Sequence, residues 1–147
     1  MKSPILIDTS VMVAATLKEH RHHQASFALI KKVMDGKIKG YLCSHSLAEA
    51  FAVLTAMPIQ PRISSELALE LMQNNFAKNF SIIELKKADY FAAMARVCKT
   101  ALKGGILYDA LIVQAALRMQ IPSLYTWNIQ HFGHLSFEEV SILQPSE

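Results

Sequence analysis

Short apolar runs alternate along the chain with longer segments in which apolar residues recur every three or four positions. The short runs are rich in β-branched residues, which is typical of strands buried on both faces. The longer segments have the period of amphipathic helices. Strands are therefore expected at Ile5–Ile7, Gly40–Cys43, Phe80–Leu85, Leu124–Trp127 and, as a fifth candidate, Val140–Leu143.

The segments between these strands carry the signals that start and stop helices. Short polar side chains precede several of them as candidate N-caps, and Gly or Pro follows. In one of these helices Phe91, Ala95, Cys98 and Leu102 fall on one face, which predicts an apolar stripe. The expected helices are Val11–Leu17 with Asp8, Thr9 and Ser10 as caps, Gln24–Met34, Ser44 or Ser46 to Met57, Ser64 or Ser65 through Met72, Lys86–Leu102, and Tyr108–Met119.

Alternating strands and helices predict the α/β class, with a central, mainly parallel sheet of four to five strands and helices on both faces. The 147 residues fit a single domain, 1–147, because no Gly/Ser-rich or Pro-rich linker divides them. In sheets of this kind, binding sites form beyond the carboxyl ends of the strands. Asp8 and Asn128 each follow an expected strand directly, so both are candidates for such a site.

The composition excludes an intrinsically disordered chain, because 52% of the residues are apolar and 18% are charged. The apolar passages are too short to span a bilayer and the N-terminus lacks the features of a signal peptide. We therefore expect no membrane segment and a cytoplasmic location. Cys43 and Cys98 have no zinc-site or disulfide spacing and are expected to be buried thiols. The formal net charge of +3 permits binding to a polyanion without establishing it.

Three carboxylates lie where apolar segments end or helices begin. Asp8 follows Ile5–Ile7, Glu49 lies early in an apolar helix, and Asp109 lies in the first turn of another. Two unit charges about 4 Å apart repel by roughly 4 kcal/mol at an effective dielectric constant of about 20. The three carboxylates would therefore converge only if protons or a cation neutralised them. A divalent metal ion at the rim of the core is the natural interpretation.

The acids stand in an ordered series of motifs that covers nearly the whole chain. The series is Ile5-Leu6-Ile7-Asp8-Thr9-Ser10-Val11, Glu49 early in a helix, Leu107-Tyr108-Asp109-Ala110-Leu111-Ile112, and Tyr125-Thr126-Trp127-Asn128-Ile129-Gln130-His131-Phe132. It resembles the PIN-domain ribonucleases, specifically VapC-type toxins. The resemblance implies a PIN-like fold, cleavage of RNA, a Mg²⁺ or Mn²⁺ cofactor and a cognate antitoxin protein as partner. It also implies that Asp8, Glu49 and Asp109 are the metal-binding acids.

Hard cations such as Mg²⁺ take oxygen ligands and keep several waters, so a few carboxylates suffice. Asp8 is the first choice as a direct ligand. Asp109 would bind directly or through water, and Glu49 could hold a water or act as general base. Thr9 and Ser10 are expected to brace Asp8 as well as to cap the helix.

The last motif departs from the family that the chain resembles. Many relatives have an acid at the position of Asn128 or of His131, and this chain has neither. Asn128 can still hydrogen-bond a water, and Thr126 can orient a neighbouring carboxylate. Asn128 is therefore a fourth candidate catalytic residue, and Thr126 is a supporting one. The alternative interpretation of this motif is a strand end followed by an asparagine turn.

Other polar and aromatic residues are open to more than one interpretation. The segment Glu19–Gln24 contains three histidines and is interpreted as a polar helix start, since no ligand-spaced acid or cysteine supports a zinc site. His131 is expected to cap or pack near its turn. Trp127 belongs either to the core or to a platform for base stacking.

Three functions stay open at this point. The first is a metal-dependent endoribonuclease that acts as a toxin. The second is another α/β hydrolase or phosphotransferase, although the haloacid dehalogenase motif requires an aspartate where Ser10 stands. The third is a PIN-like fold that has lost catalysis and only binds a partner, which the missing acid motivates. The apolar helices within Leu47–Met57 and Ile63–Phe76 also predict a homodimer.

Overall fold

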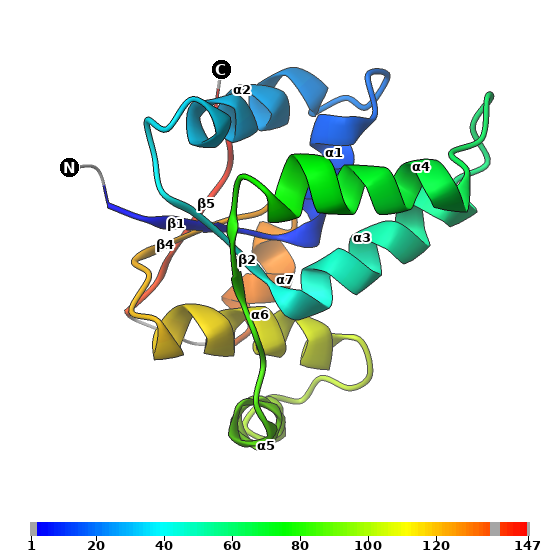
Figure 1. Cartoon of the computed structure of the whole chain (residues 1–147). Helices are drawn as coiled ribbons and strands as arrows, with labels where there is room; N and C mark the ends of the chain where they lie inside the picture. The colour runs from blue at the N-terminus through cyan, green and yellow to red at the C-terminus, as the bar shows by residue number, and fades with distance from the viewer. Residues whose placement is uncertain (1–2, 136–138, 147) are drawn as a thin grey trace.

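In the described part of the chain, five short parallel strands form the centre of the molecule (Figure 1). The computed structural model describes residues 3–135 and 139–146. The sheet has the strand order β3-β2-β1-β4-β5. Its strands are β1 (Ile5–Ile7), β2 (Gly40–Cys43), β3 (Ser81–Ile83), β4 (Ser123–Tyr125) and β5 (Ser141–Leu143), and every pair is parallel. This confirms the predicted α/β class and the fifth strand.

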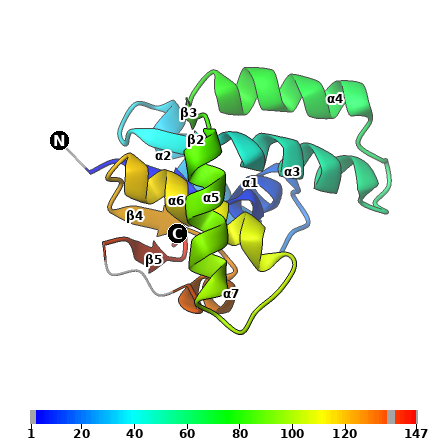
Figure 2. The same cartoon turned by 90° about the horizontal axis from the view of Figure 1, so that it is seen from below.

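The strands bury both faces because successive side chains point to opposite sides of the sheet. Ile5 and Ile7 join one core cluster, whereas Leu6 between them joins the other. The first cluster is covered by α1 (Thr9–Thr16), α2 (His23–Met34), α3 (Ser44–Ala56) and the π-helix η1 (Leu71–Ala77). The second cluster is covered by α5 (Lys87–Cys98), α6 (Ile106–Arg118) and α7 (Ile129–Gly133). The two views show these helices on opposite sides of the sheet (Figures 1 and 2).

Helix α4 (Ser65–Glu70) continues into η1 and lies beside α3. Both helices extend away from the sheet (Figures 1 and 2). The predicted N-cap Ser64 is confirmed, since its hydroxyl accepts a hydrogen bond from the backbone N–H of Leu67 at 3.1 Å. Among the described residues, no helix combines the length and the apolar character needed to cross a membrane.

The predicted apolar stripe of α5 is wrong, because that face of the helix points to solvent. Phe91 is 62% exposed and Cys98 is exposed, so only the prediction of a buried Cys43 holds. The helix also ends at Cys98, before Leu102. Its inward face carries the small Ala93 and the acidic Asp89.

Asp89 is buried because it is paired. Arg118 Nε donates to both carboxylate oxygens at 3.0 and 3.1 Å, and Gln114 Nε2 donates at 3.2 Å. Burial alone would raise the pKa of Asp89, but bonds from the Lys86 N–H, Arg118 and Gln114 hold it below its usual range. An ion pair therefore occupies a position of α5 where hydrophobic periodicity leads one to expect an apolar side chain.

Of the predicted caps of α1, Asp8 is confirmed, whereas Thr9 and Ser10 are the first residues of that helix. The predicted serine caps of α3 are wrong. Cys43 occupies the N-cap position of α3 without a side-chain bond, while the Ser44 hydroxyl accepts from the Leu85 N–H at 3.3 Å. Strands β3 and β4 are shorter than predicted. After β4 the backbone turns toward α1, where the Trp127 N–H donates to the Ser10 hydroxyl instead of to a strand.

Candidate active site

The candidate site lies where the strand order reverses. The chain runs outward from β1 to β2 and β3, and then returns to place β4 on the other side of β1. The connections that leave β1 and β4 therefore diverge, and open α/β sheets form their binding crevices at such a point. Asp8 follows β1, and Thr126, Trp127 and Asn128 follow β4.

The Asp8 carboxylate is 2% exposed, and both of its oxygens accept hydrogen bonds. Oδ1 accepts from the Thr9 backbone N–H at 2.7 Å. Oδ2 accepts from the Ser10 hydroxyl at 2.9 Å and from the Thr126 hydroxyl at 2.8 Å. Burial raises the pKa of Asp8 above its ordinary value, the bonds from Thr126, Ser10 and Thr9 oppose this rise, and the charge of Glu49 adds to it. The carboxylate is therefore fixed in orientation while its ionisation stays costly.

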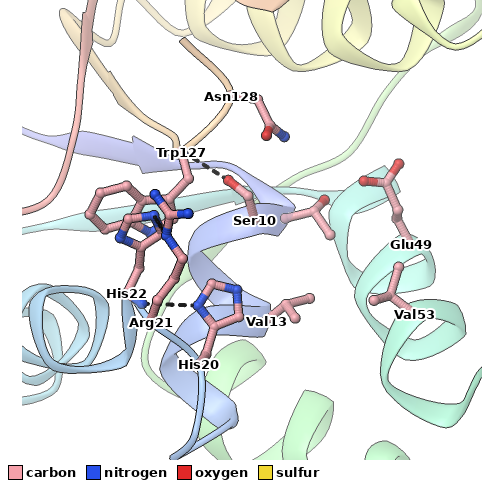
Figure 3. A pocket seen from close by; sticks show the side chains of 10 residues that line it. Ser10, Val13, His20, Arg21, His22, Glu49, Val53, Trp127 and Asn128 are labelled. Atoms are coloured by element: carbon pink, nitrogen blue, oxygen red, sulfur yellow. Dashed lines mark hydrogen bonds between the residues drawn. The ribbon is translucent and has the colours of Figure 1, made fainter. Parts of the chain in front are cut away.

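Ser10 and Thr126 also hold the loop that follows β4. The Ser10 hydroxyl accepts from the Trp127 N–H at 3.0 Å, a bond drawn in Figure 3. The Thr126 hydroxyl accepts from the Asn128 N–H at 2.9 Å. Each hydroxyl thus donates to Asp8 and accepts from the loop, so the position of Asn128 is coupled to that of Asp8.

Glu49 and Asp109 reach the same region from two other elements. Glu49 lies in the second turn of α3, which follows β2, and Asp109 lies in the first turn of α6. Burial, together with the negative charges of Asp8 and Glu49, raises the pKa of Asp109 to about 7. The acids that the sequence singled out are therefore close enough to perturb one another's ionisation.

His45 connects the two helices that carry Glu49 and Asp109. Its Nε2 lies 3.2 Å from Glu49 Oε2. Its ring stacks on Tyr108, the residue before Asp109, with centroids 4.8 Å apart and an angle of 7° between the planes. His45 is not among the residues predicted from the sequence, although its i,i+4 spacing from Glu49 is a signal that could have identified it.

Two cavities meet at Glu49. The first has a volume of about 530 Å³, and the second about 410 Å³. In the first, Glu49 of α3 stands across from Arg21 and His22, with Ser10 of α1 between them (Figure 3). The second cavity is lined by Glu49 and Asp109 together with Lys103, Tyr108, His131 and His134 among others.

The donor set suits a hard cation, because the converging groups are carboxylate oxygens. Thr9, which lines the first cavity, has a buried hydroxyl, Oγ1, with no hydrogen-bond partner among the residues that the structure describes. Among the described residues, no group of three His, Cys, Asp or Glu side chains is arranged to hold a metal ion. Mg²⁺ does not require such a cage, since one or two carboxylates with waters and substrate phosphate usually bind it. The residues fit an open, water-rich site.

Comparison with known protein families agrees with this geometry. The model of the family described as "PIN domain" matches residues 5–135. That span contains each of the acids and the loop after β4. The chain belongs to the PIN domain family.

This PIN domain is similar in sequence to two ribonucleases of Mycobacterium tuberculosis. It is 29% identical over 116 residues to ribonuclease VapC27 of Mycobacterium tuberculosis, which covers 79% of each chain. It is 26% identical over 105 residues to ribonuclease VapC40 of the same species, covering 71% of this chain and 72% of the relative.

Solved structures share the fold. VapC20 of Mycobacterium tuberculosis, a sarcin-ricin loop cleaving toxin, superposes with a TM-score of 0.70 and 16% identity, covering 92% of this chain and 98% of the other. VapBC2 of Rickettsia felis, bound to a DNA fragment from its promoter, superposes with a TM-score of 0.66 and 16% identity, covering 97% of this chain and 98% of the other.

The residues of the last motif lie at the edge of the site, and His131 departs from its predicted surroundings. Asn128 is exposed, caps α7 without a side-chain bond and lines the first cavity. His131 does not pack near its turn: its side chain is 67% exposed, with Nδ1 3.9 Å from Asp109 Oδ2. Trp127 is half-buried, and the His22 ring covers one of its faces with centroids 3.7 Å apart.

The histidine-rich segment Glu19–Gln24 has a second role that was not predicted from the sequence. It leads into α2, as predicted, but His20, Arg21 and His22 also line the first cavity. The signal in the sequence was the basic residue Arg21 between the two imidazoles of His20 and His22. Only the fold places that segment beside the loop after β4.

Proposed function

We propose that this PIN domain protein is a Mg²⁺- or Mn²⁺-dependent endoribonuclease that hydrolyses RNA phosphodiester bonds as the toxin of a toxin–antitoxin pair. The observation that carries the proposal is the crowding of Asp8, Glu49 and Asp109, which come from separate elements to the reversal point of the sheet. The names of similar proteins support it, since VapC27 is a ribonuclease and VapC20 is a toxin that cleaves the sarcin-ricin loop.

Asp8 and Asp109 are the residues that would hold the metal ion directly, and Glu49 would hold it through water. The bound ion would neutralise charge on the phosphoryl oxygens and lower the pKa of water. The raised pKa of Asp109 supports this assignment, because a bound cation would offset both the burial and the repulsion that oppose its ionisation.

The remaining steps belong to the side chains of the chain itself. Glu49 would accept the proton of the attacking water, and His45 would orient its carboxylate through the contact at 3.2 Å. Asn128 would donate its amide N–H to the substrate or to that water from the edge of the cavity. Thr126 and Ser10 would hold Asp8 in a fixed position relative to this loop.

A cognate antitoxin and a second copy of the chain are the proposed protein partners. The similarity to VapBC2 supports the antitoxin. The exposed apolar residues of α3 and α4, with Val53 at 37%, Leu67 at 43% and Leu69 at 51% exposure, support the homodimer.

A cleavage assay tests the proposed activity. The purified protein is incubated with single-stranded and structured RNA in Mg²⁺, in Mn²⁺ and in EDTA, with products resolved on a sequencing gel. Cleavage that requires the metal supports the proposal. Specific binding of RNA or of an antitoxin without cleavage in either metal would favour the second candidate, a PIN domain that only binds, which Asn128 in place of an acid motivates.

A further inference from the structure

The first cavity has walls of opposite charge. Glu49 stands on the α3 side, and His20, Arg21 and His22 stand on the side of the α1–α2 connection (Figure 3). Ser10 and Asn128, which belong to the candidate active site, also line it. The cavity is therefore continuous with the acidic site, and a linear polymer bound at the acids could extend along it to Arg21.

Arg21 is held by a series of contacts that reaches the active-site loop. Its Nε donates to His22 Nε2 at 3.1 Å. The His22 ring stacks on Trp127 with an angle of 6° between the planes, and Trp127 Nε1 donates to the Ser26 hydroxyl at 2.8 Å. Within the described part of the chain, no hydrogen bond is made by the two terminal amino groups of Arg21. The hydrogen bond at Nε orients the guanidinium, and its two terminal amino groups are available to donate to another acceptor.

The neighbouring imidazoles of His20 and His22 accept a proton less readily than an ordinary histidine. Burial, followed by the charges of Arg21 and of a second histidine, lowers the pKa of both His20 and His22 below their ordinary value. Among the described residues that line this cavity, Arg21 is the one arginine or lysine. A guanidinium fork can bind the two free oxygens of a phosphodiester with two parallel hydrogen bonds, as it also binds a carboxylate.

We propose that the first cavity is a subsite for single-stranded RNA, in which Arg21 binds the phosphate next to the one that is cleaved. The inference rests on the proposed function for the identity of the polymer. Its geometric basis is independent of the metal: an exposed arginine whose Nε is hydrogen-bonded to His22, a cavity of about 530 Å³ and continuity with the acidic site through Glu49. Arg21 is a substrate-positioning residue and takes no part in bond cleavage.

Trp127 makes the subsite directly observable, because it is the one tryptophan of the sequence and it lines this cavity. Hexauridylate is titrated in EDTA into the wild type, Arg21→Gln and Arg62→Gln, and Trp127 fluorescence is followed. Arg62 is an exposed arginine that does not line the cavity, so its variant matches the change in net charge. The titrations are repeated at several salt concentrations.

We expect a saturable change in fluorescence for the wild type and for Arg62→Gln, with about tenfold weaker binding for Arg21→Gln. The slope of log affinity against log salt should fall in magnitude by about 0.7 for Arg21→Gln, the value for one phosphate contact on a single strand. Equal affinities and slopes for the two variants, or no saturable response of Trp127, would overturn the subsite.

The same variants separate the subsite from the proposed activity. In Mg²⁺, Arg21→Gln should raise KM for a long RNA by a larger factor than KM for a dinucleotide, because a dinucleotide has no neighbouring phosphate. If the wild type binds hexauridylate through Arg21 but cleaves no RNA, the ribonuclease proposal fails and the subsite stands. If the wild type cleaves RNA and Arg21→Gln matches it on both substrates, the subsite fails and the activity stands.

Discussion

The Thr126 hydroxyl donates a hydrogen bond to Asp8 Oδ2 across 2.8 Å, although 118 positions separate the two residues in the chain. The bond joins the carboxyl ends of the neighbouring strands β1 and β4. Thr126 is fully buried, and its oxygen also accepts from the Asn128 N–H. The Thr126 hydroxyl thus fixes the position of both Asp8, which follows β1, and the loop that follows β4.

Replacing Thr126 should show this double role. Thr126→Val leaves Asp8 with one fewer donor and the Asn128 N–H without its acceptor, so we expect a loss of about 1 to 3 kcal/mol in the free energy of unfolding. Thr126→Ser keeps the hydroxyl and should lose less. Urea denaturation measures both. Thr55→Val is the matched control, because the Thr55 hydroxyl bonds only to carbonyls of its own helix. An equal loss at Thr55 would contradict the argument.

The stability of the metal-free protein should depend on Asp109 and on pH. The pKa of Asp109 is raised from 3.8 to about 7, so between these values the folded state holds a proton that the unfolded state has released. Stability should therefore fall as pH rises from 3.8 to about 7 and then level off. Asp109→Asn should remove this part of the profile and melt higher than the wild type above pH 7.

Thermal melts in EDTA across this pH range, compared between wild type and Asp109→Asn, check the prediction. The difference between the two curves isolates Asp109 from other titrating groups. A constant difference in melting temperature at all pH values would show that Asp109 ionises without hindrance.

The sequence predicted the order of strands and helices and the convergence of the acids, because both follow from local patterns. Asp8, Glu49 and Asp109 each stand at the end of a strand or near the start of a helix, and parallel strands bring such positions to one edge. Asp89 shows the limit of this reasoning. Asp89 faces inward because Arg118 neutralises its charge. Hydrophobic periodicity gives no information about where such a partner lies.

The first cavity shows a second limit. Arg21 and Trp127 lie far apart in sequence, and only the packing of the α1–α2 connection on the loop after β4 brings His22 against Trp127. The polar segment could be recognised in the sequence, but its neighbour could not. Contacts between loops depend on the lengths and angles of several preceding elements, so they lack a local signal.

Restoring the acid at position 128 should strengthen metal binding. Asn128 is exposed at the edge of the first cavity, so Asn128→Asp adds a carboxylate without a large cost of burial. We expect a lower Mg²⁺ concentration for half-maximal cleavage and unchanged folding. A metal titration of cleavage measures this, and a higher Mg²⁺ requirement would show that position 128 does not face the metal.

Self-association should depend on α4. Leu69 is 51% exposed on the helix pair that extends from the sheet, and Leu69→Lys places a charge on that surface. We expect a dimer for the wild type and a monomer for the variant by light scattering at micromolar concentration. Phe91→Lys is the control, since Phe91 is 62% exposed on α5. A monomeric wild type would contradict the predicted dimer.

The most direct test of the account is Asp8→Asn, measured for both RNA cleavage and thermal stability. An amide can keep the network around Asp8: its oxygen accepts from the Thr9 N–H, and its NH₂ donates to Ser10 and Thr126, whose hydroxyls can rotate to accept. The variant should fold with an unchanged or higher melting temperature, because a buried charge is removed, while cleavage in Mg²⁺ or Mn²⁺ falls to background. Full cleavage by Asp8→Asn would contradict the metal-nuclease account, and loss of folding together with cleavage would show that Asp8 serves chiefly as a structural cap.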